Sequence, residues 1–92
     1  MVTLKLRVDA YVLLQKAHRL SDEALTAVKS ATRMPGGRWG ISCSDDVAKE
    51  LWNWFDGCEA ASADSRWNAW KIGTCRCSKW EIEDALAERA QD

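Results

Sequence analysis

The sequence has few of the features that mark an enzyme, a membrane protein or a secreted protein. It holds one histidine and one proline among 92 residues, and no catalytic motif appears along it. Its longest uninterrupted apolar run, Ala10 to Leu14, is far shorter than the roughly 20 residues that cross a bilayer. Residues 1–7 alternate polar with apolar side chains, so they lack the apolar core of a secretion signal. These absences predict a cytoplasmic protein without catalytic activity.

Net charge is also nearly absent. Thirteen lysines and arginines stand against fourteen acidic residues, which gives a formal charge of −1. This balance excludes a broadly basic nucleic-acid binder and a strongly acidic mimic, although a local patch of either sign is compatible with it. A hydrophobic content of 47% predicts a folded chain, and one of this length builds a single core. We therefore expect one domain over residues 1–92.

Tryptophan is the abundant residue. The chain has six tryptophans but only one tyrosine and one phenylalanine. Each indole can bury roughly 150–250 Å² and needs a hydrogen-bond partner when buried. Six of them could form most of a small core, or they could leave a surplus on the surface.

The first half of the chain alternates strand and helix signals. Apolar side chains at every second position predict a strand over residues 2–8. Asp9 is placed to cap a helix over 10–19, and Ser21 to cap a second helix that runs to about residue 33. Residues 34–37, Met-Pro-Gly-Gly, predict the break that ends it.

A second strand and a third helix are expected next. Residues 39–43 alternate again, and Ser44 or Asp45 can cap a helix over 46–56. Gly57 is its expected end, and small polar residues over 59–66 predict a loop or a frayed helical end.

The last third of the chain is compatible with two readings. Residues 67–77 favour a strand through their β-branched content, with a short helix as the alternative. Ser78 begins an S-x-x-E capping box that predicts a helix over about 79–90. The order β-α-α-β-α-(β)-α predicts an α+β (or α/β) fold, with one small sheet packed by helices.

Four cysteines and His18 are the only conceivable metal ligands. Their spacing lacks the paired C-x-x-C units of zinc sites, although Cys75 and Cys77 would point to the same side of a strand. The helix expected between them argues against a Cys43–Cys58 disulfide, because its ends would lie about 20 Å apart and bonded cysteines need Cα atoms within about 7 Å. We expect reduced thiols, no cofactor and no catalytic role for His18.

Cations and indoles alternate over residues 66–80, and an acidic stripe follows at Glu81, Asp84, Glu88 and Asp92. This pattern fits an ordinary core with long basic side chains at its rim, a protein-binding surface, or a site where bases stack beside phosphate-binding cations. A helical wheel at 100° per residue places Trp80 about 160° from Ile82 and about 120° from Leu86, so we expect it on the surface. The predicted partner-binding residues are Trp67, Trp70, Lys71, Arg76, Lys79, Trp80, Asp84 and Glu88.

The function predicted from these patterns is binding to another protein, as an adaptor or inhibitor without catalysis. Weak single-stranded nucleic-acid binding through residues 66–80 is one alternative, against which the near-neutral charge argues. A homodimer with a structural role is the other, because exposed apolar surface would cause it. No membrane partner is expected.

Overall fold

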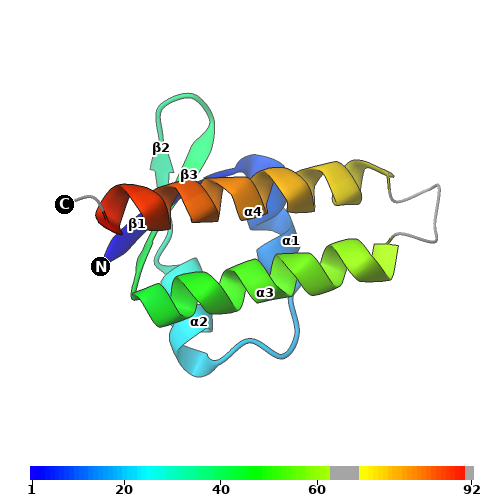
Figure 1. Ribbon diagram of the computed structural model, residues 1–92, viewed down its shortest axis with the longest axis horizontal. Coiled ribbons are helices and arrows are strands. Elements are labelled where there is room, and N and C mark those ends of the chain that lie inside the picture. Colours follow the sequence, from blue (N-terminus) through cyan, green and yellow to red (C-terminus); the bar gives the residue numbers. More distant parts are fainter. Residues whose placement is uncertain (63–68, 91–92) are drawn as a thin grey trace.

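The computed structural model describes residues 1–62 and 69–90, which form an α+β domain (Figure 1). Within these residues there are four helices and one three-stranded antiparallel sheet. The elements are β1 (Val2–Arg7), α1 (Val8–Gln15), α2 (Asp22–Lys29), β2 (Thr32–Met34), β3 (Arg38–Cys43), α3 (Asp45–Ser62) and α4 (Ala69–Ala90). The long helices α3 and α4 run antiparallel, side by side.

The sheet has one buried face and one open face. Its strand order is β1-β3-β2, and Leu4 stands opposite Ile41 in the β1–β3 pair. Alternate residues of β1 are buried and exposed, as the period of two predicts. The prediction extends one residue too far, because Val8 begins α1 and is exposed.

The helix predicted up to the glycine turn is wrong in its last part. The second helix ends at Lys29, and residues 32–34 form β2, which pairs with β3 across a hairpin. Gly36 and Gly37 have positive φ values of 83° and 73°, which glycine adopts without strain. Pairing with β3 thus overrides the helical pattern, and the turn ends a strand instead of a helix.

Of the two helix caps predicted in this half of the chain, the one at Ser21 is confirmed and the one at Asp9 is wrong. Ser21 caps α2, because its hydroxyl accepts from the Ala24 N–H at 3.1 Å. Its own N–H and hydroxyl donate to Glu50 of α3, both at 2.7 Å, so the cap also joins two helices. Asp9 is no cap, because α1 begins one residue earlier. Its carboxylate still accepts from the Ala10 N–H in the first turn at 3.0 Å, and its other oxygen accepts from the hydroxyl of Thr74 in α4 at 2.8 Å.

The third helix starts as predicted but ends later. The Ser44 hydroxyl accepts from the Val47 N–H at 3.2 Å, which agrees with one of the two expected caps. Gly57 does not end α3, which continues to Ser62. Residues 59–62 are therefore helical, which agrees with the helical end that was the alternative to a loop, and residues 63–66 lie outside the described residues.

The largest difference concerns α4, which is one helix. The strand that the sequence favours over 67–77 is wrong for residues 69–77, where the alternative of a helix is right, and the separate start predicted at Ser78 is wrong. Ser78 lies inside it and donates to the carbonyl of Thr74 at 2.7 Å. Thr74 and Ser78 are both buried, because hydrogen bonds to a backbone carbonyl and to Asp9 satisfy their hydroxyls. With polar residues on its buried face, the first half of α4 shows no apolar stripe in the sequence.

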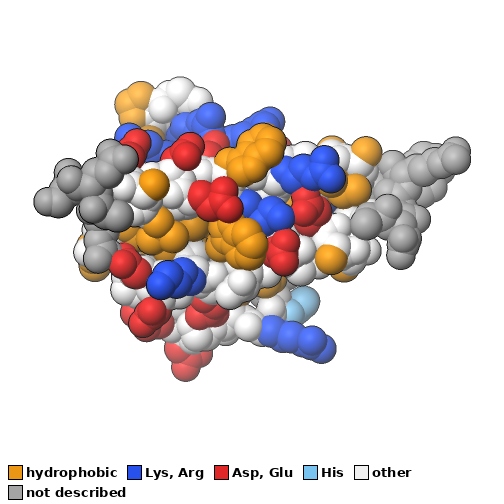
Figure 2. Space-filling model, in the orientation of Figure 1, with side chains coloured by type: hydrophobic (Ala, Val, Ile, Leu, Met, Phe, Trp, Pro, Cys, Tyr) orange, Lys and Arg blue, Asp and Glu red, His pale blue; other side chains and the backbone are white. Residues whose placement is uncertain are grey.

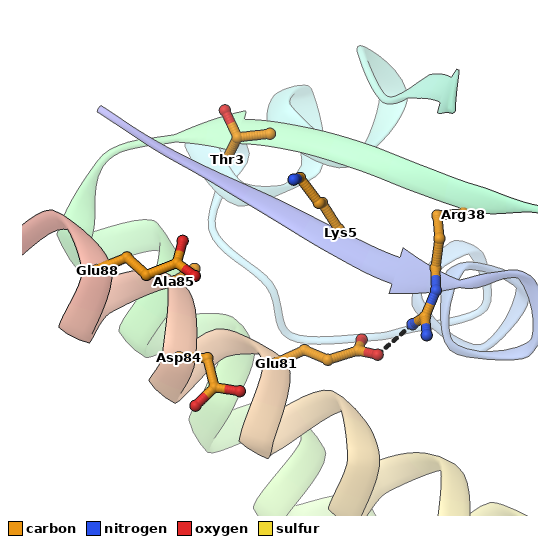
Figure 3. Close-up of a pocket in the computed structure, with 7 residues that line it drawn as sticks. All are labelled: Thr3, Lys5, Arg38, Glu81, Asp84, Ala85 and Glu88. Atoms are coloured by element: carbon orange, nitrogen blue, oxygen red, sulfur yellow. Dashed lines mark hydrogen bonds and ion pairs between the residues drawn. The ribbon is translucent and has the colours of Figure 1, made fainter. Parts of the chain in front are cut away.

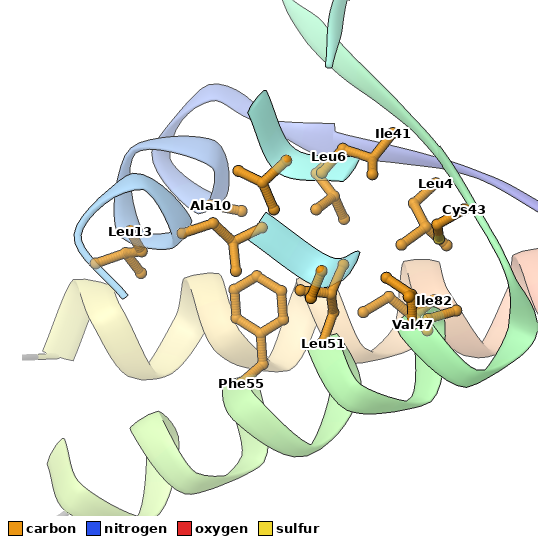
Figure 4. Packing of buried hydrophobic residues seen from close by; sticks show 14 of the residues in the cluster. Leu4, Leu6, Ala10, Leu13, Ile41, Cys43, Val47, Leu51, Phe55 and Ile82 are labelled. Atoms are coloured by element: carbon orange, nitrogen blue, oxygen red, sulfur yellow. The ribbon is translucent and has the colours of Figure 1, made fainter. Parts of the chain in front are cut away.

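The core lies between the sheet and the helices (Figure 4). Its largest fully buried side chains include Phe55, Leu51, Leu4, Leu6 and Ile82. Leu51, which helical spacing places on one side of α3 with Val47 and Phe55, is fully buried. None of the described tryptophans is fully buried, so the core is aliphatic around one phenylalanine.

Candidate functional site

The described tryptophans fall into two groups. Trp39 stacks on a tyrosine, Trp54 meets a phenylalanine edge-on, and the Trp52 indole N–H donates to a glutamate at 3.2 Å. By contrast, Trp70 and Trp80 on α4 are 54% and 61% exposed. The wheel prediction that Trp80 is exposed is therefore correct. Trp67 lies outside the described residues.

Two of the predicted binding cations join α4 to α3 instead of projecting freely. Arg76 donates to Glu59 at 2.7 Å, and the Lys79 amine contacts Glu59 and Asp56 at 2.9 and 3.0 Å. Lys79 is only 15% exposed, and its amine also lies 5.2 Å from the centre of the Trp52 ring. These contacts make Lys79 mainly a structural residue.

The electrostatics of this cluster agree with its geometry. The hydrogen bond from Lys79 is the main cause that lowers the pKa of Glu59, and the same bond raises the pKa of Lys79. Each group favours the charged form of the other. A ligand could therefore bind neither charge without breaking a contact between α3 and α4.

The outward side of α4 carries a row that we call the α4 ridge. Its members follow one another at alternating intervals of three and four residues, which keeps them on one side of a helix. All are exposed except Cys77, which is half-buried. The α4 ridge consists of Trp70, Gly73, Cys77, Trp80, Asp84 and Ala87. In the space-filling view, apolar side chains emerge among charged ones over this part of the molecule (Figure 2).

The other predicted residues of this segment lie beside the α4 ridge. The Lys71 amine is 5.6 Å from the centre of the Trp70 ring. Glu88 is exposed one turn beyond Asp84. Asp92, the last member of the predicted acidic stripe, lies outside the described residues.

A groove separates α4 from the open face of the sheet (Figure 3). Its volume is about 310 Å³. Basic and hydroxyl side chains of the sheet line one wall, and acidic side chains of α4 line the other. The lining includes Thr3, Lys5 and Arg38 on the first wall, and Glu81, Asp84 and Glu88 on the second.

An ion pair closes one end of this groove. Arg38 bonds Glu81, whose pKa is raised because its burial outweighs the opposing effect of Arg38. The sequence analysis missed Lys5 and Arg38, because a charged outer strand face is ordinary in a solvated sheet. The feature that marks this end of the groove is the pairing of the strands, which places Arg7 opposite Arg38. Like charges placed so destabilise a sheet, and here Asp9 and Glu81 pair with the two arginines.

The cysteines are all free thiols. Burial is the largest cause that raises the pKa of Cys75 to about 12, and hydrogen bonding with Cys58 adds to it. Because α4 is a helix, Cys75 and Cys77 point about 200° apart on its circumference, so the shared side expected of a strand is wrong. Within residues 1–62 and 69–90, no three potential ligands come together to hold a metal ion. His18 is exposed in the segment after α1 rather than on a helix flank.

Comparison of the chain with protein-family models, with curated proteins and with solved structures gives no match. No helix in the described part of the chain combines the length and the apolar character needed to cross a membrane.

Proposed function

We propose that this protein is a non-catalytic protein-binding module, of the adaptor or inhibitor type, that docks a partner on the α4 ridge. One observation carries the proposal. Trp70 and Trp80 stay more than half exposed, although the other described indoles find partners within the fold. Tryptophan is the residue type most enriched among those that dominate binding energy at protein interfaces.

The charges beside the indoles favour a protein over a nucleic acid. Arg76 and Lys79 pair with carboxylates of α3, which neutralises two of the three predicted binding cations and leaves Lys71 beside Trp70. Asp84 and Glu88 follow Trp80 at intervals of four residues and would repel phosphates. The chemistry expected of the partner is an apolar side chain flanked by lysine or arginine, which these carboxylates attract.

Catalysis is not part of the proposal. The α4 ridge is the outward, convex side of a helix, whereas catalytic groups work where they converge in a site sheltered from water. Indole rings and carboxylates on such a surface supply contact area and hydrogen bonds. We place the protein in the cytoplasm, a proposal that its four free thiols support.

Affinity capture from the native host tests the proposal. Wild-type protein and Trp80→Ala are immobilised in parallel, with Lys49→Ala as a control at an exposed position of α3. Captured proteins are quantified by mass spectrometry with and without nuclease. We expect a set of proteins that Lys49→Ala retains, Trp80→Ala loses and nuclease does not affect.

Two results would contradict the proposal. Identical protein sets on the wild type and on Trp80→Ala would remove the α4 ridge from the binding surface. Capture that nuclease abolishes, and that falls steeply with salt, would establish the nucleic-acid alternative.

A further inference from the structure

We infer that the partner which the α4 ridge fits is a second copy of this chain, with the two α4 helices packed antiparallel across a two-fold axis. The inference rests on the proposed function, because it names the occupant of the same surface. It is carried by the spacing, the sizes and the charges of the residues along α4.

The spacing is that of paired helices. Intervals alternating between three and four average 3.5 residues, the repeat with which side chains of two helices interdigitate. Between Trp70 and Ala87 the α4 ridge extends over about 25 Å at 1.5 Å per residue. The opposite side of α4, which includes Cys75 and Ile82, is buried in the core. On the outward side, the Arg7 guanidinium donates to the Cys77 sulfur at 3.9 Å, whereas Trp70 and Trp80 stay more than half exposed.

The sizes are self-complementary in one antiparallel register. It places Trp70 opposite the second copy's Ala87, and Trp80 opposite the second copy's Cys77, so each large ring meets a small residue. Gly73 then faces the second copy's Asp84, and a Cβ atom built on Gly73 would meet no atom within 4 Å. The two-fold axis repeats each of these pairs. A parallel pair of helices would instead place Asp84 against Asp84 of the second copy, where the two carboxylates would repel each other.

The charges beside the α4 ridge agree with the same register. Arg76 then flanks the second copy's Glu83, and both residues are exposed. One oxygen of Glu83 accepts from the Trp52 indole N–H in its own chain at 3.2 Å, which leaves the other oxygen of the carboxylate to bind Arg76. Arg76 is 62% exposed and uses Nε to reach Glu59. A guanidinium has five N–H donors, so Arg76 can bind a second carboxylate without leaving the first. The two-fold axis makes two such ion pairs.

Sedimentation equilibrium of the purified chain tests the inference through a charge swap. We expect a dimer with a dissociation constant in the micromolar range, because one helix pair is a small interface. Arg76→Glu and Glu83→Arg should each weaken the dimer about tenfold, and the double variant should recover most of the loss. Within one chain the two positions are seven residues apart, too far to compensate each other. Lys49→Glu, an equal charge change elsewhere, should leave the constant unchanged.

Folding is monitored by circular dichroism, because Glu83→Arg removes the acceptor of the Trp52 indole N–H and the carboxylate that Arg76→Glu introduces would face Glu59. The double variant keeps that repulsion, so its recovery has to come from contacts between the two copies. A wild type that stays monomeric at millimolar concentration would overturn the inference, as would a double variant no tighter than the singles. A monomer that still loses its host partners on Trp80→Ala would leave the proposed function standing. A monomer that captures the same host proteins as its Trp80→Ala variant would contradict both the inference and the proposed function.

Discussion

At Lys79 a structural role and a binding role can be distinguished most clearly. The sequence predicts a contact with a partner, and the structure shows contacts between this side chain and α3. Lys79→Met keeps most of the aliphatic chain and removes the charge. The amine loses its contacts with Glu59 and Asp56, at 2.9 and 3.0 Å, and its position over the Trp52 ring.

The expected loss follows from these contacts. A hydrogen bond to a charged group contributes about 1.5–3 kcal/mol, and a partly exposed cation–π contact about 0.5–1 kcal/mol. Asp56 is exposed, so solvent screens its contact and we count it as negligible. Glu59 keeps Arg76 as a partner, which lowers the cost of removing Lys79. We therefore expect a loss of about 2 kcal/mol in the free energy of unfolding.

Urea unfolding followed by circular dichroism measures this loss. Lys49→Met, at an exposed position of α3, is the matched control and should change stability by less than about 0.5 kcal/mol. Partner binding by Lys79→Met should persist under conditions in which the variant is folded. A Lys79→Met protein as stable as the control, but deficient in binding, would refute the structural assignment.

Four further outcomes are expected. Leu51→Ala should cost about 2–5 kcal/mol because the side chain is fully buried, and a urea-measured loss below about 1 kcal/mol would contradict its place in the core. Ser21→Ala should cost about 1 kcal/mol through the lost cap, and an unchanged midpoint would show that water replaces it. Cys75, with its pKa raised to about 12, should be alkylated last in the native protein at neutral pH. After denaturation without reductant all four cysteines should react, and a smaller number would reveal a disulfide. The lowered pKa of Glu59 adds stability above the ordinary glutamate pKa, which is lost as the pH falls through the lowered value. Urea midpoints against pH should therefore show a smaller acid loss in Glu59→Gln.

The correctly predicted elements depend on short-range patterns. Alternation along residues 2–7 and 38–43 is enough to identify two strands, and the side chain of Ser21 caps the helix that follows it. The strand β2 escapes prediction because its three residues are held by pairing with β3, which no local pattern shows. The first half of α4 escapes it because Thr74 and Ser78 occupy positions where an apolar residue is expected.

The candidate site is predictable in part for the same reasons. The wheel places Trp80 opposite Ile82 wherever the helix begins, so an incorrect capping box does not affect its exposure. Lys79 precedes Trp80 by one residue, and its side chain points toward α3. Its burial depends on which side of α4 that helix occupies, which the spacing within one helix does not show. The groove beside Lys5 likewise requires knowledge of where α4 crosses the sheet.

Oxidative footprinting of the tryptophans tests the central claim, that the α4 ridge is a docking surface, most directly. Hydroxyl radicals label the protein in dilute solution, in concentrated solution and in extract of its native host, and mass spectrometry locates the oxidised residues. Met1, which is 89% exposed, serves as the internal reference. We expect Trp70 and Trp80 to react fast when dilute and to become protected together when concentrated or in extract, while Trp39 changes little. Equal reactivity of Trp70 and Trp80 under all three conditions would contradict the account.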